Sequence, residues 1–354
     1  MYENGDGVAK DSFEAVKWYR KAADQGLATA QLQLGWRYAN GDGVPKDSAE
    51  AAKWYRKAAD QGDAHAQWLL GLAYEDGDGV AKDSAEAVKW YRKAADQGDA
   101  HAQWHLGLAY AHGDGVPKDS AEAVLWHRRA ANQGYFLAQW WLGSIYQRGD
   151  GVPKDSTEAM KWYRKAADQG NATAQWHLGL AYEDGDGVPK DNAEAVKWYR
   201  KAAEQGDAVA QFRLGLMYEN GDGVPKDSAK AARWYRKAAG QGNAVAQSRL
   251  GAMYANGDGV PKDHAKALKW YRKAADQGDA SAQYILGVMY ENGDGGPKDE
   301  SEALAWYKIA AASGDDGAVK SRDALDLRLG REATLLAQQR SKEILKKIEA
   351  AKAR

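Results

Sequence analysis

The sequence contains no cysteine, no long apolar run and no excess of charge of either sign. Without cysteine the chain can form neither disulfides nor a thiol nucleophile, although this does not indicate a cellular compartment. No apolar segment approaches the ~20 residues of a membrane-spanning helix, and the first residues lack the basic start and apolar stretch of a signal peptide. The 49 basic residues balance 50 acidic ones, so we find no basic stripe that would neutralise nucleic-acid phosphates.

What the sequence has in abundance is repetition, with a period of 36 residues. Tyrosine recurs nine times at this spacing from Tyr2 to Tyr290, and tryptophan recurs nine times from Trp18 to Trp306. A period of this length is typical of a solenoid, in which each unit buries its apolar face only against its neighbours. The repeat therefore predicts the fold, and function has to be sought in the residues that depart from it.

The first part of one unit, residues 63–98, predicts a helix of about three turns. Asp63 is a good N-cap because its carboxylate can accept from the open backbone N–H groups of the first turn. Gly71 would allow another helix to approach closely, and Gly77 is expected to end the helix in a left-handed conformation. Apolar residues at i, i+4 and i+8 form one stripe, made of Ala66, Leu70 and Tyr74.

The second part of the unit predicts a tight turn and a second helix. The turn contains two glycines and, in seven of the nine copies, a proline. Asp83 with Glu86 three residues later fits a capping box. The helix that follows is amphipathic, with an apolar side made of Ala87, Val88, Trp90, Tyr91, Ala94 and Ala95. Each unit is thus predicted to be an antiparallel helix pair.

These residues resemble the Sel-one-like repeat (SLR) family, a relative of the tetratricopeptide repeat (TPR). The matching string is A-x-A-Q-x-x-L-G-x-x-Y-x-x-G-x-G-V-x-K-D followed by A-x-x-W-x-x-x-A-A-x-x-G, and it covers residues 1–314. The resemblance implies an all-α fold, a right-handed α-solenoid whose first helices line the concave face. It also implies a scaffold or adaptor for other proteins, typically bacterial. We expect a half repeat at residues 1–26, eight complete repeats at 27–314 and a helical cap at 315–354.

The last 40 residues depart from the repeat. Where the other units have Leu, Gly and Tyr on the first-helix stripe, this segment has Arg322, Asp323 and Asp326. A longer helix from about Glu332 to Lys352 follows, with an apolar side made of Leu336, Ile344, Leu345 and Ile348. Terminal repeats need a polar outer surface, which favours a cap. A coiled-coil dimer through this helix is the alternative.

No motif indicates catalysis or a cofactor. An EF-hand alignment that places Asp42 and Gly43 at loop positions 5 and 6 puts Tyr38 at position 1 and Pro45 at position 8, so it fails. The Gly-x-Gly of the turn lacks the third glycine and the preceding strand of a phosphate-binding loop. No serine is followed three residues later by lysine, the pair that penicillin-binding proteins use. We therefore expect a protein that is not an enzyme and carries no cofactor.

The histidines raise the question of a metal site. His101 and His105 share a helix face at a spacing that can chelate zinc, and His65 occupies the place of His101 one repeat earlier. No cysteine or evident carboxylate completes a ligand set, so exposed groove histidines are the favoured interpretation and no metal is expected. His127 and His264 have no evident role.

Comparison of the eight complete copies gives the first helix a constant side and a variable side. We call the positions of His65, Leu69 and Leu72 the variable stripe. Packing between units must be satisfied in the same way in each unit, so a stripe that varies is predicted to lie outside that packing and, by the resemblance, to face a peptide-binding groove. Drift on a solvated face is the alternative. Between the two sides lies an aromatic ladder, interpreted mainly as packing: Trp68, Trp104, Trp140, Trp176, Phe212 and Tyr284.

The copy from Leu125 to Arg148 departs furthest from the others. His127 replaces a tyrosine there, and three large residues replace the usual Asp/Asn-Ala start of the first helix. Aromatic residues near an arginine are typical of binding hot spots, although local repacking of one repeat would also explain them. The predicted binding residues are Tyr135, Phe136, Leu137, Trp140, Trp141 and Arg148, with Trp68, Trp104, Trp176, His101 and His105 as further candidates.

The sequence thus predicts a non-enzymatic scaffold or adaptor that binds a protein or peptide in the concave groove. Carbohydrate or cell-wall glycan binding through the groove aromatics is the alternative. We expect no nucleic-acid partner, no membrane span and a monomer, with the dimer through the C-terminal helix as the other possibility. The partner and the compartment, whether periplasm, cytoplasm or outside the cell, are left open.

Overall fold

The structure, a computed structural model, describes residues 11–352, with side chains to residue 350, and within this range it is built from α-helices and turns without strands. Tyr2 and the start of the expected half repeat lie outside the described residues. The helices are α1 (Ser12–Asp24), α2 (Ala28–Asn40), α3 (Ser48–Asp60), α4 (Ala64–Asp76), α5 (Ser84–Asp96), α6 (Ala100–His112), α7 (Ser120–Asn132), α8 (Phe136–Arg148), α9 (Ser156–Asp168), α10 (Ala172–Asp184), α11 (Asn192–Glu204), α12 (Ala208–Asn220), α13 (Ser228–Gly240), α14 (Ala244–Asn256), α15 (His264–Asp276), α16 (Ala280–Asn292), α17 (Glu300–Ala312), α18 (Asp316–Arg328) and α19 (Arg331–Lys352).

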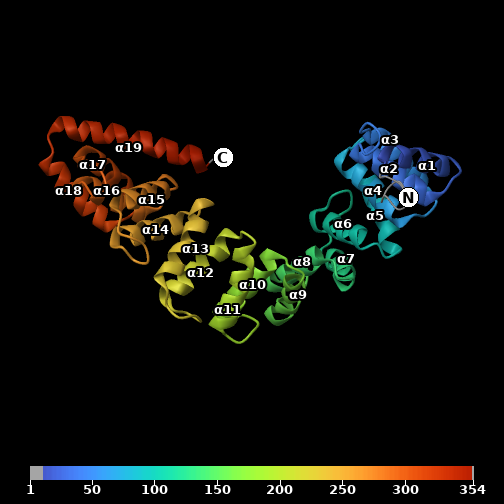
Figure 1. The fold of residues 1–354 in the computed structure, drawn as a ribbon, viewed down its shortest axis with the longest axis horizontal. Helices are drawn as coiled ribbons and strands as arrows, with labels where there is room; N and C mark the ends of the chain where they lie inside the picture. The colour runs from blue at the N-terminus through green and yellow to red at the C-terminus, as the bar shows by residue number, and fades with distance from the viewer. Residues whose placement is uncertain (1–10, 353–354) are drawn as a thin grey trace. The chain divides into compact units, whose positions relative to one another are not determined.

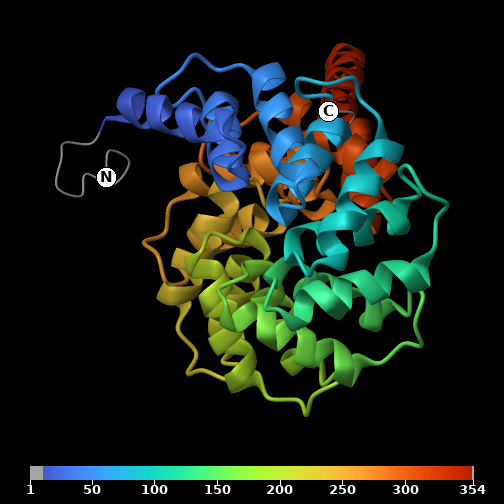
Figure 2. The same cartoon turned by 90° about the vertical axis from the view of Figure 1, so that its right-hand side faces the viewer.

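The predicted helix pairs are confirmed (Figures 1 and 2). We call the even-numbered helices α2 to α18 A helices and the odd-numbered helices α1 to α17 B helices. The chain forms two compact units, one ending at Asn171 and one beginning at Ala172. Within each unit an A helix packs on the B helices before and after it. Across residues 11–352 none of the helices combines the length and the apolar character needed to cross a bilayer.

The ends of the A helices follow their sequence signals. The Asp63 carboxylate accepts from the backbone N–H of Ala66 at 2.8 Å and caps α4. Gly77 ends the same helix with φ +82° and donates its N–H to the carbonyl of Ala73. This is a left-handed conformation, which glycine adopts with less strain than any other residue.

The predicted capping box of the B helix is only half correct. Asp83 accepts from the backbone N–H of Glu86 at 3.0 Å. The Glu86 carboxylate, however, pairs with the Lys89 ammonium at 2.8 Å instead of returning to the cap, and the N–H of Asp83 donates to the carbonyl of Tyr74. The reciprocal bond is missing because the turn already satisfies that donor.

Small residues bring the two helices of each pair together. A Cβ atom on Gly71 would lie 2.5 Å from the ring of Tyr91, so the close approach predicted for this glycine is confirmed. All six residues predicted for the apolar side of the second helix, from Ala87 to Ala95, are buried.

The B-helix tryptophans join successive repeats. Trp90 of α5 lies in the same buried cluster as Tyr55 and Ala58 of α3, one repeat earlier. Trp162 of α9 likewise packs with Val124 of α7 and Leu142 of α8. Each indole thus belongs to the core of the preceding repeat, which is the nearest-neighbour packing that a solenoid requires.

Buried glutamines connect the same elements through hydrogen bonds. Gln67 is almost fully buried and donates from Nε2 to the carbonyl of Ala59 at 3.0 Å. Its own Oε1 accepts from Gln97 at 2.8 Å. The pattern recurs, as in Gln211 with Ala203 and Gln241. Because the amide group has both partners, its burial carries little penalty.

The last helix does not continue the alternation. α19 runs back over α17 and reaches α15 (Figure 1). Ile344 and Ile348 are buried in the cluster that contains Trp306, which is 1% exposed. Of the four residues predicted for the apolar side of this helix, Leu336 is exposed, and Ala337 and Ser341 are buried in line with the two isoleucines instead.

Candidate functional site

A row of ring side chains crosses the A helices of the first unit. The ring centroids of Trp68 and His65 are 4.9 Å apart, and those of Trp68 and His101 are 4.7 Å apart. His101 meets Tyr135 edge-on at 5.2 Å, and Tyr135 lies 6.2 Å from Phe136. All five side chains are partly or well exposed. We call these five residues the aromatic row, and it runs from α4 across α6 to the start of α8.

A carboxylate lies against two histidines of the row. Asp99 has one oxygen 3.8 Å from Nδ1 of His65 and the other 3.9 Å from Nδ1 of His101. It also caps α6 by accepting from the N–H of Ala102 at 2.8 Å. Burial alone would raise the pKa of Asp99, but the imidazole of His65 and the N–H of Ala102 outweigh it and lower the pKa. A negative charge is therefore held close to the surface of the row.

A second layer of rings supports the row. Trp104 lies 5.9 Å from Tyr135 and 4.7 Å from His127, and His127 lies 3.7 Å from Trp141. His127 is fully buried, and neither of its ring nitrogens has a hydrogen-bond partner in the described part of the chain. Burial lowers the pKa of this imidazole to about 3. The expectation that His127 has no role is therefore wrong, since it lies at the centre of this packing.

His101 and His105 do not act together. His105 stacks on Tyr91 with ring centroids 5.1 Å apart, and its Nδ1 lies 3.4 Å from the carboxylate of Glu75. This contact holds the pKa of Glu75 below its ordinary value, against the effect of burial. His101 contacts Asp99 instead. Among the residues that the structure describes, no group of three or more His, Asp or Glu side chains is arranged to hold a metal ion.

The middle position of the variable stripe is not free of packing, so that prediction is wrong. Three of the residues there contact the residue 30 positions earlier, at the end of the preceding A helix, as His105 does with Glu75. Arg213 contacts Glu183 at 3.3 Å, and Arg249 contacts Glu219 at 3.7 Å. Where the earlier residue is alanine, the later one is large and apolar. The matched pairs within the two units are Ala39 with Leu69, Glu75 with His105, Ala111 with Trp141, Glu183 with Arg213, Glu219 with Arg249 and Ala255 with Ile285.

The remaining predicted residues are dispersed. Trp140 and Trp176 are half-buried, and the indole N–H of each has no hydrogen-bond partner within residues 11–350. Leu137 is half-buried on α8. Arg148, at the other end of that helix, is exposed and pairs with Asp150 at 2.7 Å. These four residues do not contribute rings or charges to the aromatic row.

Sequence comparison agrees with this architecture. The sequence pattern of the Sel1 repeat matches nine segments, residues 1–27, 28–63, 64–99, 100–135, 137–171, 172–207, 208–243, 244–279 and 280–315. The chain belongs to the Sel1 repeat family. Proteins built from Sel1 repeats generally mediate protein–protein interactions and are generally non-enzymatic scaffolds. The resemblance to the SLR family is thereby confirmed, and with it the α-solenoid class of fold.

Two bacterial Sel1 repeat structures are similar to this chain over most of their length. One is c5321, a protective antigen present in uropathogenic Escherichia coli strains, with 34% identity, a TM-score of 0.61 and an alignment that covers 98% of this chain and 90% of that one. The other is a Sel1 repeat protein from Oxalobacter formigenes, with 35% identity, a TM-score of 0.65 and coverage of 89% and 93%. A comparison with curated proteins gave no match.

Proposed function

We propose that this protein is a non-enzymatic adaptor that binds a protein or peptide partner through the aromatic row of its first unit. The observation that carries the proposal is the continuity of the row, in which rings from three A-helix segments contact one another in series and stay accessible to solvent. Aromatic side chains dominate binding hot spots because they present a large, rigid contact area. The general role of Sel1 repeats in protein–protein interaction supports this class of partner.

The start of α8 supports the proposal further. Phe136 is 40% exposed, and the other seven complete copies have alanine there, so the fold does not need the ring. Tyr135 makes no side-chain cap bond, whereas Asp63, Asp99, Asp207 and Asp279 cap the equivalent helices. Loss of such a cap costs about 1 kcal/mol. The helix does not need the side chain of Tyr135 or of Phe136 for its own stability. We therefore expect both side chains to contact a partner.

Carbohydrate binding has less support from this geometry. A sugar ring would stack on an open aromatic face, and Trp68 is the largest ring of the row. Its indole, however, lies against both His65 and His101, at centroid distances of 4.9 and 4.7 Å. Peptide side chains can bind at the exposed ring edges without an open face, which favours the protein partner.

The experiment uses a displayed random-peptide library selected on the full chain. Phe136→Ala introduces the residue of the other copies, so it should fold normally and weaken the selected peptides at least tenfold, ~1.4 kcal/mol. Val245→Ala is the matched control, because Val245 is an apolar residue of similar exposure, 48%, on an A helix of the second unit. Peptides that bind both variants as well as they bind the unmodified protein would contradict the assignment of the site.

A further inference from the structure

In most repeats the buried tyrosine of the B helix has a hydrogen-bond acceptor at the end of the preceding A helix. The tyrosine hydroxyl donates to a carboxylate or amide oxygen located 16 residues earlier in the sequence. The pairs are Tyr91 with Glu75, Tyr163 with Gln147, Tyr199 with Glu183, Tyr235 with Glu219 and Tyr307 with Glu291. This bond satisfies the hydroxyl of an otherwise buried ring.

The first complete repeat lacks this acceptor. Residue 39 is alanine, so the hydroxyl of Tyr55 has no hydrogen-bond partner among residues 11–350, although the side chain is only 6% exposed. Burial raises the pKa of Tyr55 to about 12, so the hydroxyl keeps its proton and can donate. The space that a glutamate side chain would fill is open here.

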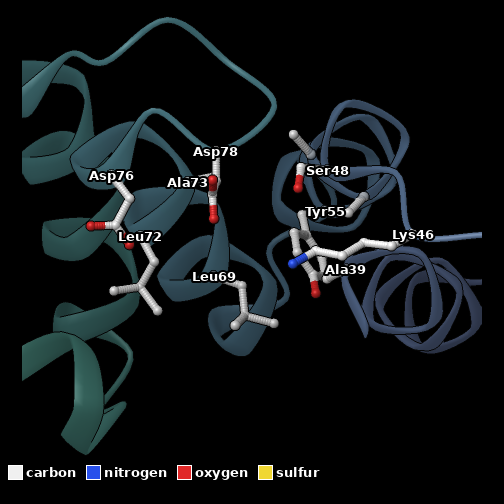
Figure 3. A pocket seen from close by; sticks show the side chains of 11 residues that line it. Ala39, Lys46, Ser48, Tyr55, Leu69, Leu72, Ala73, Asp76 and Asp78 are labelled. Carbon is white, nitrogen blue, oxygen red and sulfur yellow. The ribbon is translucent and has the colours of Figure 1, made fainter. Parts of the chain in front are cut away.

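A pocket of about 210 Å³ occupies this space, between α2, α3 and α4 (Figure 3). It exceeds the ~150 Å³ cavity that is known to hold a benzene molecule, so it can hold a small organic ligand. Lys46 extends into it from one side, and the carboxylates of Asp76 and Asp78 lie on the opposite side (Figure 3). Leu69 and Leu72 supply an apolar wall.

We propose that this pocket binds a small zwitterion, a free α-amino acid with an apolar side chain. The ligand carboxylate takes the place of the absent glutamate, where it accepts from the hydroxyl of Tyr55 and pairs with Lys46. The ammonium group lies toward Asp76 and Asp78. A carboxylate alone would leave the two aspartates uncompensated, and an amine alone would leave the tyrosine and the lysine without an acceptor. The zwitterion places an opposite charge next to Lys46 and next to the two aspartates. Hydrogen bonds to charged groups are stronger than those between neutral groups.

This site is distinct from the aromatic row in its residues and in the size of its ligand. The test is an NMR titration of the methyl groups of Leu69 and Leu72 with three probes that share the same branched apolar chain. L-Leucine carries both charges, 4-methylpentanoate only the carboxylate and 3-methylbutylamine only the ammonium. We expect leucine to bind at least tenfold more tightly than either of the others. No shift with millimolar leucine, or equal binding of the three probes, would overturn the proposal.

The variants separate the pocket from the rest of the surface. Ala39→Glu restores the arrangement of Glu75 and Tyr91, so the protein should fold at least as well and lose leucine binding. Lys46→Gln should weaken binding at least tenfold, whereas Lys82→Gln, the same change one repeat later, should leave it unchanged. Retention of leucine binding by a folded Ala39→Glu protein would place the ligand elsewhere and refute the assignment.

Discussion

The buried imidazole of His127 makes the stability of the first unit depend on pH. In the folded protein its pKa is lowered to about 3 by burial, whereas in the unfolded chain it returns to about 6.5. Above pH 6.5 both states hold a neutral imidazole, and the stability is fully present. As the pH falls from 6.5 toward 3, the imidazole of His127 binds a proton in the unfolded chain but not in the folded chain, so stability is lost. The loss is about 1.4 kcal/mol per pH unit, or about 2 kcal/mol at pH 5.

Hydrogen exchange of the α7 and α8 amides at pH 7 and pH 5 measures this local stability, because repeats can open separately from one another. His127→Phe keeps a buried ring and removes the titrating group together with its two unpaired nitrogens. Between pH 7 and pH 5, the free energy of opening α7 and α8 should fall by about 2 kcal/mol less in the variant than in the unmodified protein. His112→Asn is the matched control, because His112 is exposed and asparagine occupies the same place in four of the other complete copies.

The prediction depends on the pKa of His127 in the folded protein. If the imidazole of His127 titrates near pH 6.5 in the folded protein, the ring is not sealed between Trp104 and Trp141. The same conclusion would follow if His127→Phe and the unmodified protein lost equal stability between pH 7 and pH 5.

Three further changes test the packing. Trp162→Ala removes an indole shared by two repeats and should lower the free energy of unfolding by about 3–5 kcal/mol in urea titrations; a loss below about 1 kcal/mol would contradict the proposed core. Deletion of residues 315–354 should expose Trp306 and cause aggregation or fraying, and an unchanged melting temperature with a monomeric protein in light scattering would argue against a capping role. Trp141→Ala should destabilise the protein by about 2 kcal/mol because the ring packs on His127; a free energy of unfolding within about 0.5 kcal/mol of that of the unmodified protein would show that the contact is dispensable.

The repeat made the helix pairs, the caps and the B-helix core predictable from sequence. Period, cap residues and apolar spacing are local signals, and each recurs often enough to remove ambiguity. The path of α19 was not predictable, because its apolar residues would fit either another chain or α17. The role of His127 was missed because a single substitution was considered without the residues that face it. The signal was nevertheless present, since Trp141 is the only tryptophan at its position and departs from the other copies together with His127.

The matched pairs also change what the variable stripe means. Arg213, for example, pairs with Glu183 of the preceding A helix. Much of the variation at that position therefore depends on the residue of the neighbouring repeat and carries no information about a partner. The position of His65 is not matched to a residue of the preceding A helix, since His65 itself contacts Trp68, His101 and Asp99. Its equivalents include Val209 and Val245, which are 44% and 48% exposed without any change in the fold around them. Within the first unit, partner selection is therefore expected mainly at that outer position, where His65 and His101 belong to the aromatic row.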